Sequence, residues 1–210
     1  MKLSLKREKI SLDIFFVTIS IKRGKMIILC SSSSTRAKLL KKANIHFIQK
    51  SCEFDEEKIK SKDPYEFVVL ASLGKFKECI KCFKSENIVS ADTVVTDGKK
   101  ILRKAKNKEE AREILLAQSG KEIKIVTSMW VRFKGQIFGR VDETIYEFKE
   151  FNKEDLEKYL ESNEWVGKAG ACMVEGFCKK YIKSVKGYES TAMGLCVEEL
   201  LKIIGDNNAH

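Results

Sequence analysis

The sequence predicts a mixed α/β fold, and three observations support that class. A short apolar run, Met26–Leu29, precedes a helical pattern, as in a strand that is followed by a helix. A second apolar run, Ile88–Val95, is followed by an Asp-Gly turn and a short return strand at Lys100–Leu102. Two segments, Ile123–Phe133 and Val141–Phe151, alternate apolar and polar residues as half-buried strands do. Strands that pair with their neighbours are therefore interspersed with helices.

The length and composition of the chain limit how it is organised. At 210 residues it is long enough for one large domain or for two small lobes around one cleft, and its 43% hydrophobic residues support a substantial core. We expect the functional domain to span 26–206, with a tail at 207–210. Residues 1–25 are expected to be a dispensable basic and apolar extension, or the product of an upstream start site. Their apolar run, Leu12–Ile21, is too short to span a bilayer, so no membrane partner is expected.

The first half of the domain contains two expected helices. Thr35–Ala43 is expected to follow the first strand as a helix, and Cys52–Glu57 to be an acidic loop. Asp63 is expected to cap a longer helix that has Pro64 at its first position. The apolar stripe of that helix is expected to consist of Val69, Leu73, Phe76, Ile80 and Phe83. Lys75 falls outside this stripe, so its ammonium group is free to point toward a cleft.

The second half continues the alternation of strands and helices. The strand at Ile88–Val95 is expected to be interrupted at Ser90–Asp92. Asn107–Glu110 has the form of a capping box that starts a helix, and Gly120 ends that helix. The remaining elements are expected to be a short helix at Asn152–Leu160, a Gly-rich loop at Gly167–Gly176, a strand at Tyr181–Val185 and a closing helix through Val197–Ile204.

The net charge of +10 suits an anionic partner, either a nucleic acid or a nucleotide. Of the 40 basic residues, 33 are Lys and seven are Arg, and they are spread along the chain among acidic residues. Because Arg is favoured for contacts to base edges, this distribution favours a solvated basic surface over a nucleic-acid groove. The seven Cys residues are expected to be free thiols in a reducing cytoplasm, and the Cys79–Cys82 motif lacks the second cysteine pair of a zinc site.

The serine run Ser31–Ser34 lies between the first strand and its helix. Small residues let backbone N–H groups approach an anion, the helix N-terminus adds partial positive charge, and Arg36 can bond two phosphate oxygens. The run lacks the Gly spacing and the Gly-Lys pair of a Walker loop. It favours phosphate binding, while a solvated Ser-rich helix cap remains an alternative.

Asp92 is the carboxylate of greatest interest, because an acid within a β-favouring run is costly unless it is paired, hydrated or bound to metal. An exposed strand edge would also accommodate Asp92. Ordinary surface positions would explain the other three charged residues if each is taken singly, namely Lys75, Lys104 and Glu56. Taken together, these cations and carboxylates can hold a triphosphate and a divalent metal, because hard cations prefer carboxylate and phosphate oxygens.

In their order along the chain, these residues resemble the Maf family of nucleotide pyrophosphatases. Leu29–Leu40 is similar to the family's opening Leu-Ala-Ser-x-Ser-Pro-Arg-Arg-x-x-Leu-Leu, and Ala91–Val95 matches its Ala-Asp-Thr-Val-Val. The other segments that resemble family motifs are Glu53–Glu56, Ala71–Lys75, Leu102–Ala105, Gln118–Gly120, Lys168–Gly176 and Gly194–Cys196. The resemblance spans about Met26 to Ile204 with matching spacing, which is far more specific than any single motif.

The resemblance implies an elongated mixed sheet in two lobes flanking a deep cleft, similar to the ITPase-like enzymes. It implies hydrolysis of a nucleoside triphosphate, standard or modified, to the monophosphate and pyrophosphate with Mg²⁺ or Mn²⁺. A house-cleaning role and a link to septum formation would follow. The roles it implies are proton acceptor for Asp92, catalytic charge neutralisation for Lys75 and Lys104, phosphate binding for Ser31, Ser32 and Arg36, metal binding for Glu56 and Asp92, and base recognition for Glu175 and Lys168.

Four positions depart from the family pattern. Thr35 replaces the first Arg of the opening motif, Ser34 replaces its Pro, and Ile123 replaces a His. Glu175 replaces a Gln near the base-binding end. An ionised Glu only accepts hydrogen bonds, so this change favours a base that presents N–H donors, such as guanine or a methylated guanine.

Other classes of function are compatible with the sequence. A nucleic-acid-binding module is suggested by the net charge, although the sequence contains no recognition motif for it. A non-catalytic nucleotide-binding regulator of cell division is suggested by the loss of an Arg at Thr35. Among enzymes, a phosphatase that removes only the terminal phosphate would differ in its products. The sequence is compatible with a homodimer and does not determine the oligomeric state.

Overall fold

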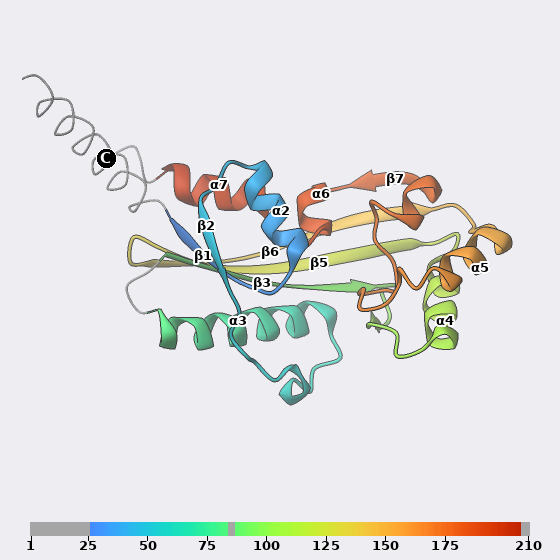
Figure 1. Cartoon of the computed structure of the whole chain (residues 1–210), viewed down its shortest axis with the longest axis horizontal. Coiled ribbons are helices and arrows are strands. Elements are labelled where there is room, and N and C mark those ends of the chain that lie inside the picture. The colour runs from blue at the N-terminus through green and yellow to red at the C-terminus, as the bar shows by residue number, and fades with distance from the viewer. Residues whose placement is uncertain (1–25, 84–86, 207–210) are drawn as a thin grey trace, which may run out of the picture.

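The computed structural model describes residues 26–83 and 87–206, and these form a mixed sheet with helices on both faces (Figure 1). The strand order is β2-β1-β3-β5-β6-β7, with β4 paired to β3. β1 is parallel to β2 and β3, whereas the β3–β5, β5–β6 and β6–β7 pairs are antiparallel. The strands are β1 (Ile27–Cys30), β2 (Phe47–Lys50), β3 (Asn87–Thr96), β4 (Ile101–Leu102), β5 (Glu122–Phe133), β6 (Gln136–Phe148) and β7 (Ile182–Lys186).

Figure 1 shows the long strands β3, β5 and β6 running the length of the molecule, with α3 below the sheet and α2, α6 and α7 above it. α4 and α5 pack together at the far end of the sheet. The mixed α/β class expected from the sequence is confirmed. The helices are α2 (Ser34–Lys42), α3 (Pro64–Cys82), α4 (Lys108–Gln118), α5 (Lys153–Glu161), α6 (Glu189–Ala192) and α7 (Val197–Asp206), with short 3₁₀ helices η1 (Glu56–Lys58) and η2 (Phe177–Tyr181).

Two sets of buried side chains fill the two ends of the molecule. At one end, Leu29, Leu40 and Leu200 belong to a core between β1, α2 and α7. At the other end, Leu115 and Tyr159 belong to a core formed by α4, α5 and the strand ends beside them. Each end therefore buries its own apolar surface, and the long strands connect the two lobes.

The free edge of β3 explains where a cleft opens. β5 pairs with one edge of β3 from Ile88 to Thr96. The opposite edge is paired with β1 only as far as Val89, and β4 pairs with it again at Val95. Between these partners the segment 90–94 has an open edge, so successive side chains from both faces of β3 can border one space.

The course of β3 corrects the expected interruption at Ser90–Asp92, and the turn after it confirms the expected hairpin. β3 is continuous through Asp92, so the expected interruption is absent from this strand. Pairing with β5 along nine consecutive residues keeps the segment extended despite its polar side chains. The Asp97-Gly98 hairpin turn is confirmed, because Val95 pairs with Leu102 and Gly98 has φ of +83°.

The β5–β6 hairpin begins earlier than the alternation at Val141–Phe151 indicated. Its turn is Lys134-Gly135, with φ values of +49° and +80°, and β6 starts at Gln136. The left-handed backbone at both turn positions is that of the tight turns that match the twist of antiparallel strands. The first part of β6 lacks clear alternation because many of its side chains on both faces are exposed or half-buried.

The buried face of α3 differs from the expected stripe. Its fully buried residues are Phe67, Val68, Ala71, Ser72, Phe76 and Cys79. Small residues dominate the middle of this face because the helix packs closely against the sheet, and hydrophobicity alone does not identify them. Lys75 is four residues from both Ala71 and Cys79, so it lies on the line that faces the sheet and not on a separate face.

Side-chain caps begin the main helices as the sequence indicated. The Oδ1 of Asp63 accepts a hydrogen bond from the Glu66 amide at 2.8 Å, with Pro64 at the first helical position. Asn107 caps α4 in the same way. The second half of its expected capping box is altered, because Glu110 accepts from the amide of Lys106 instead of that of Asn107.

The structure corrects the expectation of seven free thiols. Cys30 is paired with Cys79, and Cys172 with Cys178, with Cα atoms 6.5 Å apart in each pair. The Cys30–Cys79 pair joins residues 49 positions apart, which only the packing of α3 on β1 brings together. The free cysteines are Cys52, Cys82 and Cys196.

The extension at 1–25 and the tail at 207–210 lie outside the described residues, so their proposed boundaries remain predictions. Within 26–83 and 87–206, no helix combines the length and the apolar character that crossing a membrane requires.

Candidate active site

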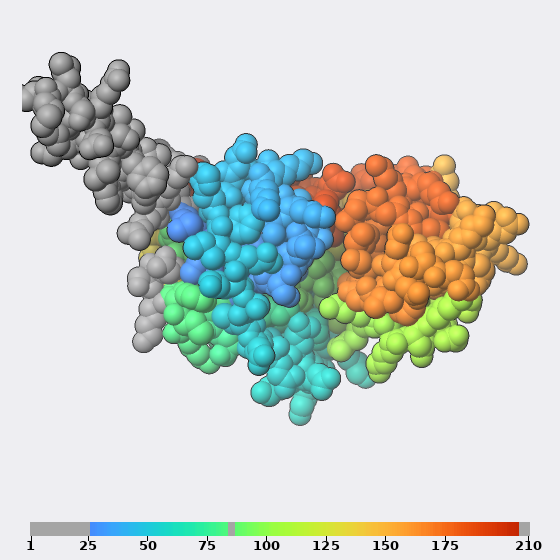
Figure 2. All heavy atoms as spheres, in the orientation of Figure 1, coloured from blue at the N-terminus to red at the C-terminus, as the bar shows by residue number. Residues whose placement is uncertain are grey.

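A cleft of about 850 Å³ opens between the two lobes. In Figure 2 it lies between the blue surface near α2 and the orange surface of the loop that precedes η2. All nine residues to which the sequence assigned a site role line this cleft. They are Ser31, Ser32, Arg36, Glu56, Lys75, Asp92, Lys104, Lys168 and Glu175.

The serine turn forms one wall of the cleft. Ser33 is the N-cap of α2, and its Oγ accepts a hydrogen bond from the backbone amide of Arg36 at 3.3 Å. The Oγ of Ser31 accepts one from the amide of Ser33 at 3.1 Å. Ser32 is exposed to the cleft. The first turn of α2 contains no acidic residue, so its N-terminus presents positive potential to an anion in the cleft.

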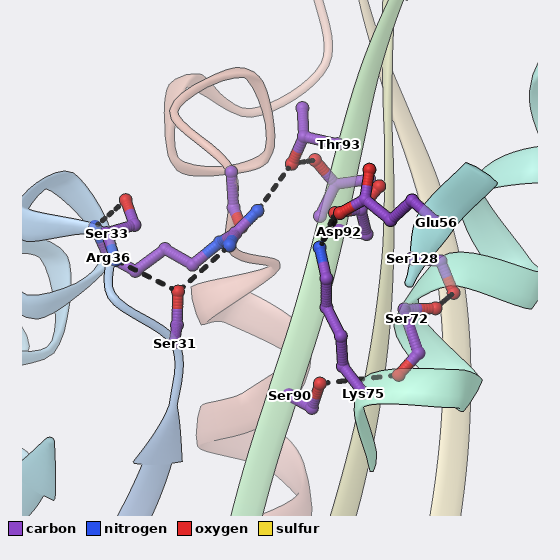
Figure 3. Close-up of polar contacts among 12 residues, drawn as sticks. Ser31, Ser33, Arg36, Glu56, Ser72, Lys75, Ser90, Asp92, Thr93 and Ser128 are labelled. Atoms are coloured by element: carbon purple, nitrogen blue, oxygen red, sulfur yellow. Dashed lines mark hydrogen bonds and ion pairs between the residues drawn. The ribbon is translucent and has the colours of Figure 1, made fainter. Parts of the chain in front are cut away.

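Arg36 binds three separate segments of the chain (Figure 3). Its Nε donates to the carbonyl of Gly194 at 2.7 Å, and its two terminal nitrogens donate to Ser31 Oγ at 3.0 Å and Thr93 Oγ1 at 3.2 Å. Gly194 has φ of +104°, and a Cβ atom there would lie 3.3 Å from Arg36 Nε. Arg36 therefore positions the serine turn, and only its remaining N–H groups can serve a phosphate.

Lys75 lies between two carboxylates (Figure 3). Its Nζ is 2.5 Å from Asp92 Oδ1 and 2.6 Å from Glu56 Oε1. The side chain of Asp92 is 11% exposed, whereas that of Glu56 is 45% exposed. The expected grouping of Lys75, Asp92 and Glu56 is thus present, with Asp92 at the floor of the cleft and Glu56 at its rim.

Burial dominates the electrostatics of Asp92. Desolvation raises the pKa of Asp92, and the charges of Lys75 and Arg36 act in the opposite direction. Burial also lowers the pKa of Arg36, against the nearby charges of Asp92 and Glu56. A carboxylate with a raised pKa is a stronger proton acceptor than an exposed one.

Polar side chains beneath the acid link α3 to the sheet. The Oγ of Ser72 donates to Ser128 Oγ at 2.7 Å, and the Oγ of Ser90 donates to the Ser72 carbonyl at 3.3 Å (Figure 3). All three residues are buried. Sequence reasoning did not identify Ser72 or Ser128, because a serine on a helix or strand shows its burial only once these elements pack together.

Phe54 holds the acidic loop against α3. A Cβ atom at Gly74 would stand 2.1 Å from the outermost carbon of the Phe54 ring, so the ring packs onto the bare backbone of the helix. Phe54 precedes Glu56 by two residues, and Gly74 immediately precedes Lys75. This contact therefore sets the position of the Glu56 carboxylate relative to Lys75.

Gly74→Ala is expected to lower turnover by about tenfold, because the new methyl group displaces Phe54 and with it Glu56. The fold should persist, since Ala is favoured over Gly inside a helix. Steady-state kinetics with thermal unfolding would measure both effects. Gly205→Ala is the matched control, because a Cβ at Gly205 in α7 meets nothing within 4 Å. Equal turnover in the two variants would contradict this role of the Phe54 contact.

The opposite wall combines Lys104 with the Gly-rich loop. Lys104 forms an isolated antiparallel bridge with Ala169, and the Gly170 amide donates to the Leu102 carbonyl at 3.1 Å. Gly170 has φ of +65°, and a Cβ there would lie 3.1 Å from the side chain of Val95. Lys168 is half-buried, whereas Glu175 is exposed at the far end of the same wall. The backbone thus brings these two residues to the side of the cleft opposite Ser31.

Thr93 is a site residue that sequence reasoning did not single out. Its Oγ1 accepts from Arg36 and forms a 2.9 Å hydrogen bond with Thr127 Oγ1. Thr127 in turn donates to the carbonyl of Thr191 at 2.7 Å. Thr93 lies within the Ala91–Val95 segment that matches a family motif, so its position next to Asp92 was the available signal.

A mixed α/β fold whose cleft gathers cations, hydroxyl groups and a buried carboxylate defines a protein suited to bind a polyphosphate. The Maf-like protein family matches residues 26–207, and the chain belongs to that family. A nucleoside triphosphate pyrophosphatase of a Nitratiruptor species is 52% identical over 184 residues, 86% of this chain and 100% of that protein. One of Helicobacter pylori is 43% identical over 83% of this chain and 93% of that protein.

Among solved structures, a HAM1 protein from Coxiella burnetii superposes with a TM-score of 0.43 and 12% sequence identity. The superposition covers 86% of this chain and 98% of that protein.

Proposed function

We propose that the chain is a nucleoside triphosphate pyrophosphatase, which hydrolyses its substrate to the nucleoside monophosphate and pyrophosphate. The observation that carries this proposal is the placement of Lys75 between Asp92 and Glu56, across the cleft from Lys104 and beside the serine turn. The curated relatives named nucleoside triphosphate pyrophosphatase support the reaction class. Removal of such nucleotides from the pool would make this a house-cleaning enzyme.

In the proposed reaction, the oxygen of a water molecule bonds to the α-phosphorus while the bond to the bridging oxygen of pyrophosphate breaks. Asp92 accepts the proton that the water loses. Its burial supports this role, because desolvation raises its pKa and strengthens it as a base. The reaction requires little covalent assistance from the protein, so positioning and charge neutralisation account for most of the rate.

The phosphates would be held from two sides. On the near wall, Ser31, Ser32 and the free N–H groups of Arg36 donate hydrogen bonds. On the far wall, Lys104 supplies positive charge from a backbone position secured by its bridge to Ala169. Cations on both walls would neutralise the charge that develops on the departing pyrophosphate.

The donor set fits a hard divalent cation. Glu56 and Asp92 both reach the same nitrogen of Lys75, and carboxylate oxygens with phosphate oxygens are the ligands that Mg²⁺ and Mn²⁺ prefer. The metal, held by Glu56 and Asp92, would supply charge neutralisation at the phosphates. Lys75 Nζ lies between these carboxylates, so it would contact them less closely where they hold a cation, and its charge would then be available to the phosphates.

The reaction is tested by measuring pyrophosphate release from dTTP, UTP, CTP, GTP and 7-methyl-GTP, with and without Mg²⁺ or Mn²⁺. We expect metal-dependent release from at least one of them, with the monophosphate as the second product. Release of inorganic phosphate with a diphosphate product would identify a terminal phosphatase instead. A folded protein that releases neither from any substrate would favour a non-catalytic nucleotide-binding regulator.

Glu175 is proposed to read the base, with Lys168 on the same wall. Glu175→Gln is expected to shift the ratio of kcat/KM from guanine toward uracil or thymine by about tenfold, because the amide adds an N–H donor. Competition between GTP or 7-methyl-GTP and UTP measures that ratio. Glu164→Gln, which changes an exposed acid outside the cleft, is the control. An unchanged ratio would exclude Glu175 from base recognition.

A further inference from the structure

Three cysteines from distant segments gather behind the serine turn. Cys30 ends β1, Cys52 lies in the loop after β2, and Cys79 lies in the last turns of α3. Their Sγ atoms all lie within 4.8 Å of one another, and the Sγ atoms of Cys52 and Cys79 are 2.9 Å apart. Cys30 and Cys79 are buried and Cys52 is half-buried, so the cluster extends from the core toward the surface.

Cys82 offers a fourth thiol one helical turn beyond Cys79, outside the three cysteines whose Sγ atoms lie within 4.8 Å of one another. It follows Cys79 by three residues in α3, which puts both on one side of the helix. Burial raises the pKa of Cys52, and the charge of the neighbouring Cys82 thiol acts in the same direction. Cys82 is exposed, so this end of the cluster is open to solvent. The second pair of cysteines that the Cys79–Cys82 motif lacks in the sequence is thus supplied by Cys30 and Cys52.

We propose that the reduced chain binds one Zn²⁺ ion through the thiolates of these four cysteines. Three sulfur atoms already gathered from a helix and two separate segments, with a fourth thiol on the same side of that helix, suit the tetrahedral geometry of a structural zinc site, with Zn–S distances of about 2.3 Å. Each thiol releases its proton to solvent when it coordinates the metal. Thiolates are soft ligands, so this site selects Zn²⁺ over the Mg²⁺ or Mn²⁺ that suits the carboxylates of the cleft.

The metal and the Cys30–Cys79 pair are alternatives for the same two sulfur atoms. The pair present in the structure must first accept two electrons and two protons from a thiol or phosphine reductant, which becomes oxidised. Two thiols result, and with Cys52 and Cys82 they complete the ligand set. Zinc binding is therefore expected only after reduction of the chain.

The position of the cluster suggests what the ion would stabilise. Cys30 directly precedes Ser31, Cys52 begins the loop that leads to Glu56, and Cys79 is one turn from Lys75. Cys30 and Cys52 also line the same cleft. A zinc ion would thus fasten together the three segments that carry the serine turn, the acidic loop and the lysine. This support of the three segments does not depend on the proposed reaction.

Cobalt titration of the full chain tests the proposal without nucleotide. The protein is reduced with a phosphine, freed of metal by a chelator and titrated with Co²⁺. We expect one Co²⁺ per chain, with the charge-transfer and d–d absorption of tetrahedral thiolate coordination, and displacement by Zn²⁺ but not by Mg²⁺. Cys79→Ser and Cys52→Ser should weaken binding by more than about 100-fold, since changes outside the ligand set already cost 10–100-fold. Cys172→Ser, in the other lobe, should bind as the parent does.

Absence of thiolate absorption from a reduced, folded chain with seven titratable thiols would overturn the proposal. Full cobalt absorption in Cys52→Ser would do the same, and this variant avoids the buried core because Cys52 lies on a half-exposed loop. The experiment measures metal content and absorption and uses no nucleotide. Absence of hydrolysis would therefore leave the zinc site supported, and absence of zinc binding would leave the proposed hydrolysis untouched.

Discussion

Asp92→Asn is expected to lower kcat by about 100- to 10,000-fold, because the amide cannot accept the proton from the attacking water. The fold should survive the change. Burial raises the pKa of Asp92, so its charged form lowers the free energy of unfolding. This loss of stability is absent while Asp92 is protonated and develops as pH rises through the pKa of Asp92 in the folded state. At neutral pH the amide removes this cost, so we expect thermal unfolding of the variant no lower than that of the parent.

The pH profile of the parent provides a second measure of the same residue. Because the reaction requires ionised Asp92, kcat/KM should fall as pH decreases through a pKa above the ordinary Asp value. Asp97→Asn is the matched control. Asp97 Oδ1 accepts hydrogen bonds at 2.9 Å from the amides of Lys99 and Lys100, so its loss should lower stability but not kcat. Near-parental turnover in Asp92→Asn would rule Asp92 out as the proton acceptor.

Lys75→Met is expected to reduce both activity and stability. The change leaves Asp92 and Glu56 side by side without the ammonium that each contacts, and it removes a phosphate-neutralising cation. We expect kcat to fall by about 100-fold. Breaking a buried ion pair costs several kcal/mol, but Lys75 is 22% and Glu56 45% exposed, so a loss of about 1–3 kcal/mol is expected.

The stability loss in Lys75→Met should depend on pH. Without the Lys75 charge, the pKa of Asp92 rises further, so the difference in unfolding free energy between variant and parent should grow as pH rises and shrink in acid. Urea unfolding at several pH values measures it. Lys75→Arg should recover most of the stability, and Lys77→Met, an exposed neighbour on α3, should change neither property. A loss that is independent of pH would contradict the pairing of Lys75 with Asp92.

The sequence by itself determined several local features of this protein. Caps at Asp63 and Asn107, the Asp97-Gly98 turn and the break at Gly120 depend on contacts within a few residues, and the structure contains each of them. The ordered motifs also identified the family, and the nine residues to which they gave a proposed role all line the cleft. These features could be predicted because each depends on residue type and spacing along one short segment.

Only the tertiary structure decided which distant residues meet. The open edge of β3 between β1 and β4 lets Asp92 and Thr93, on opposite faces of one strand, border the same cleft. The close packing of α3 places Lys75 toward the sheet and brings Cys79 to Cys30. Such contacts depend on how backbones pack across tens of residues, and neither propensity nor periodicity along the chain carries that information.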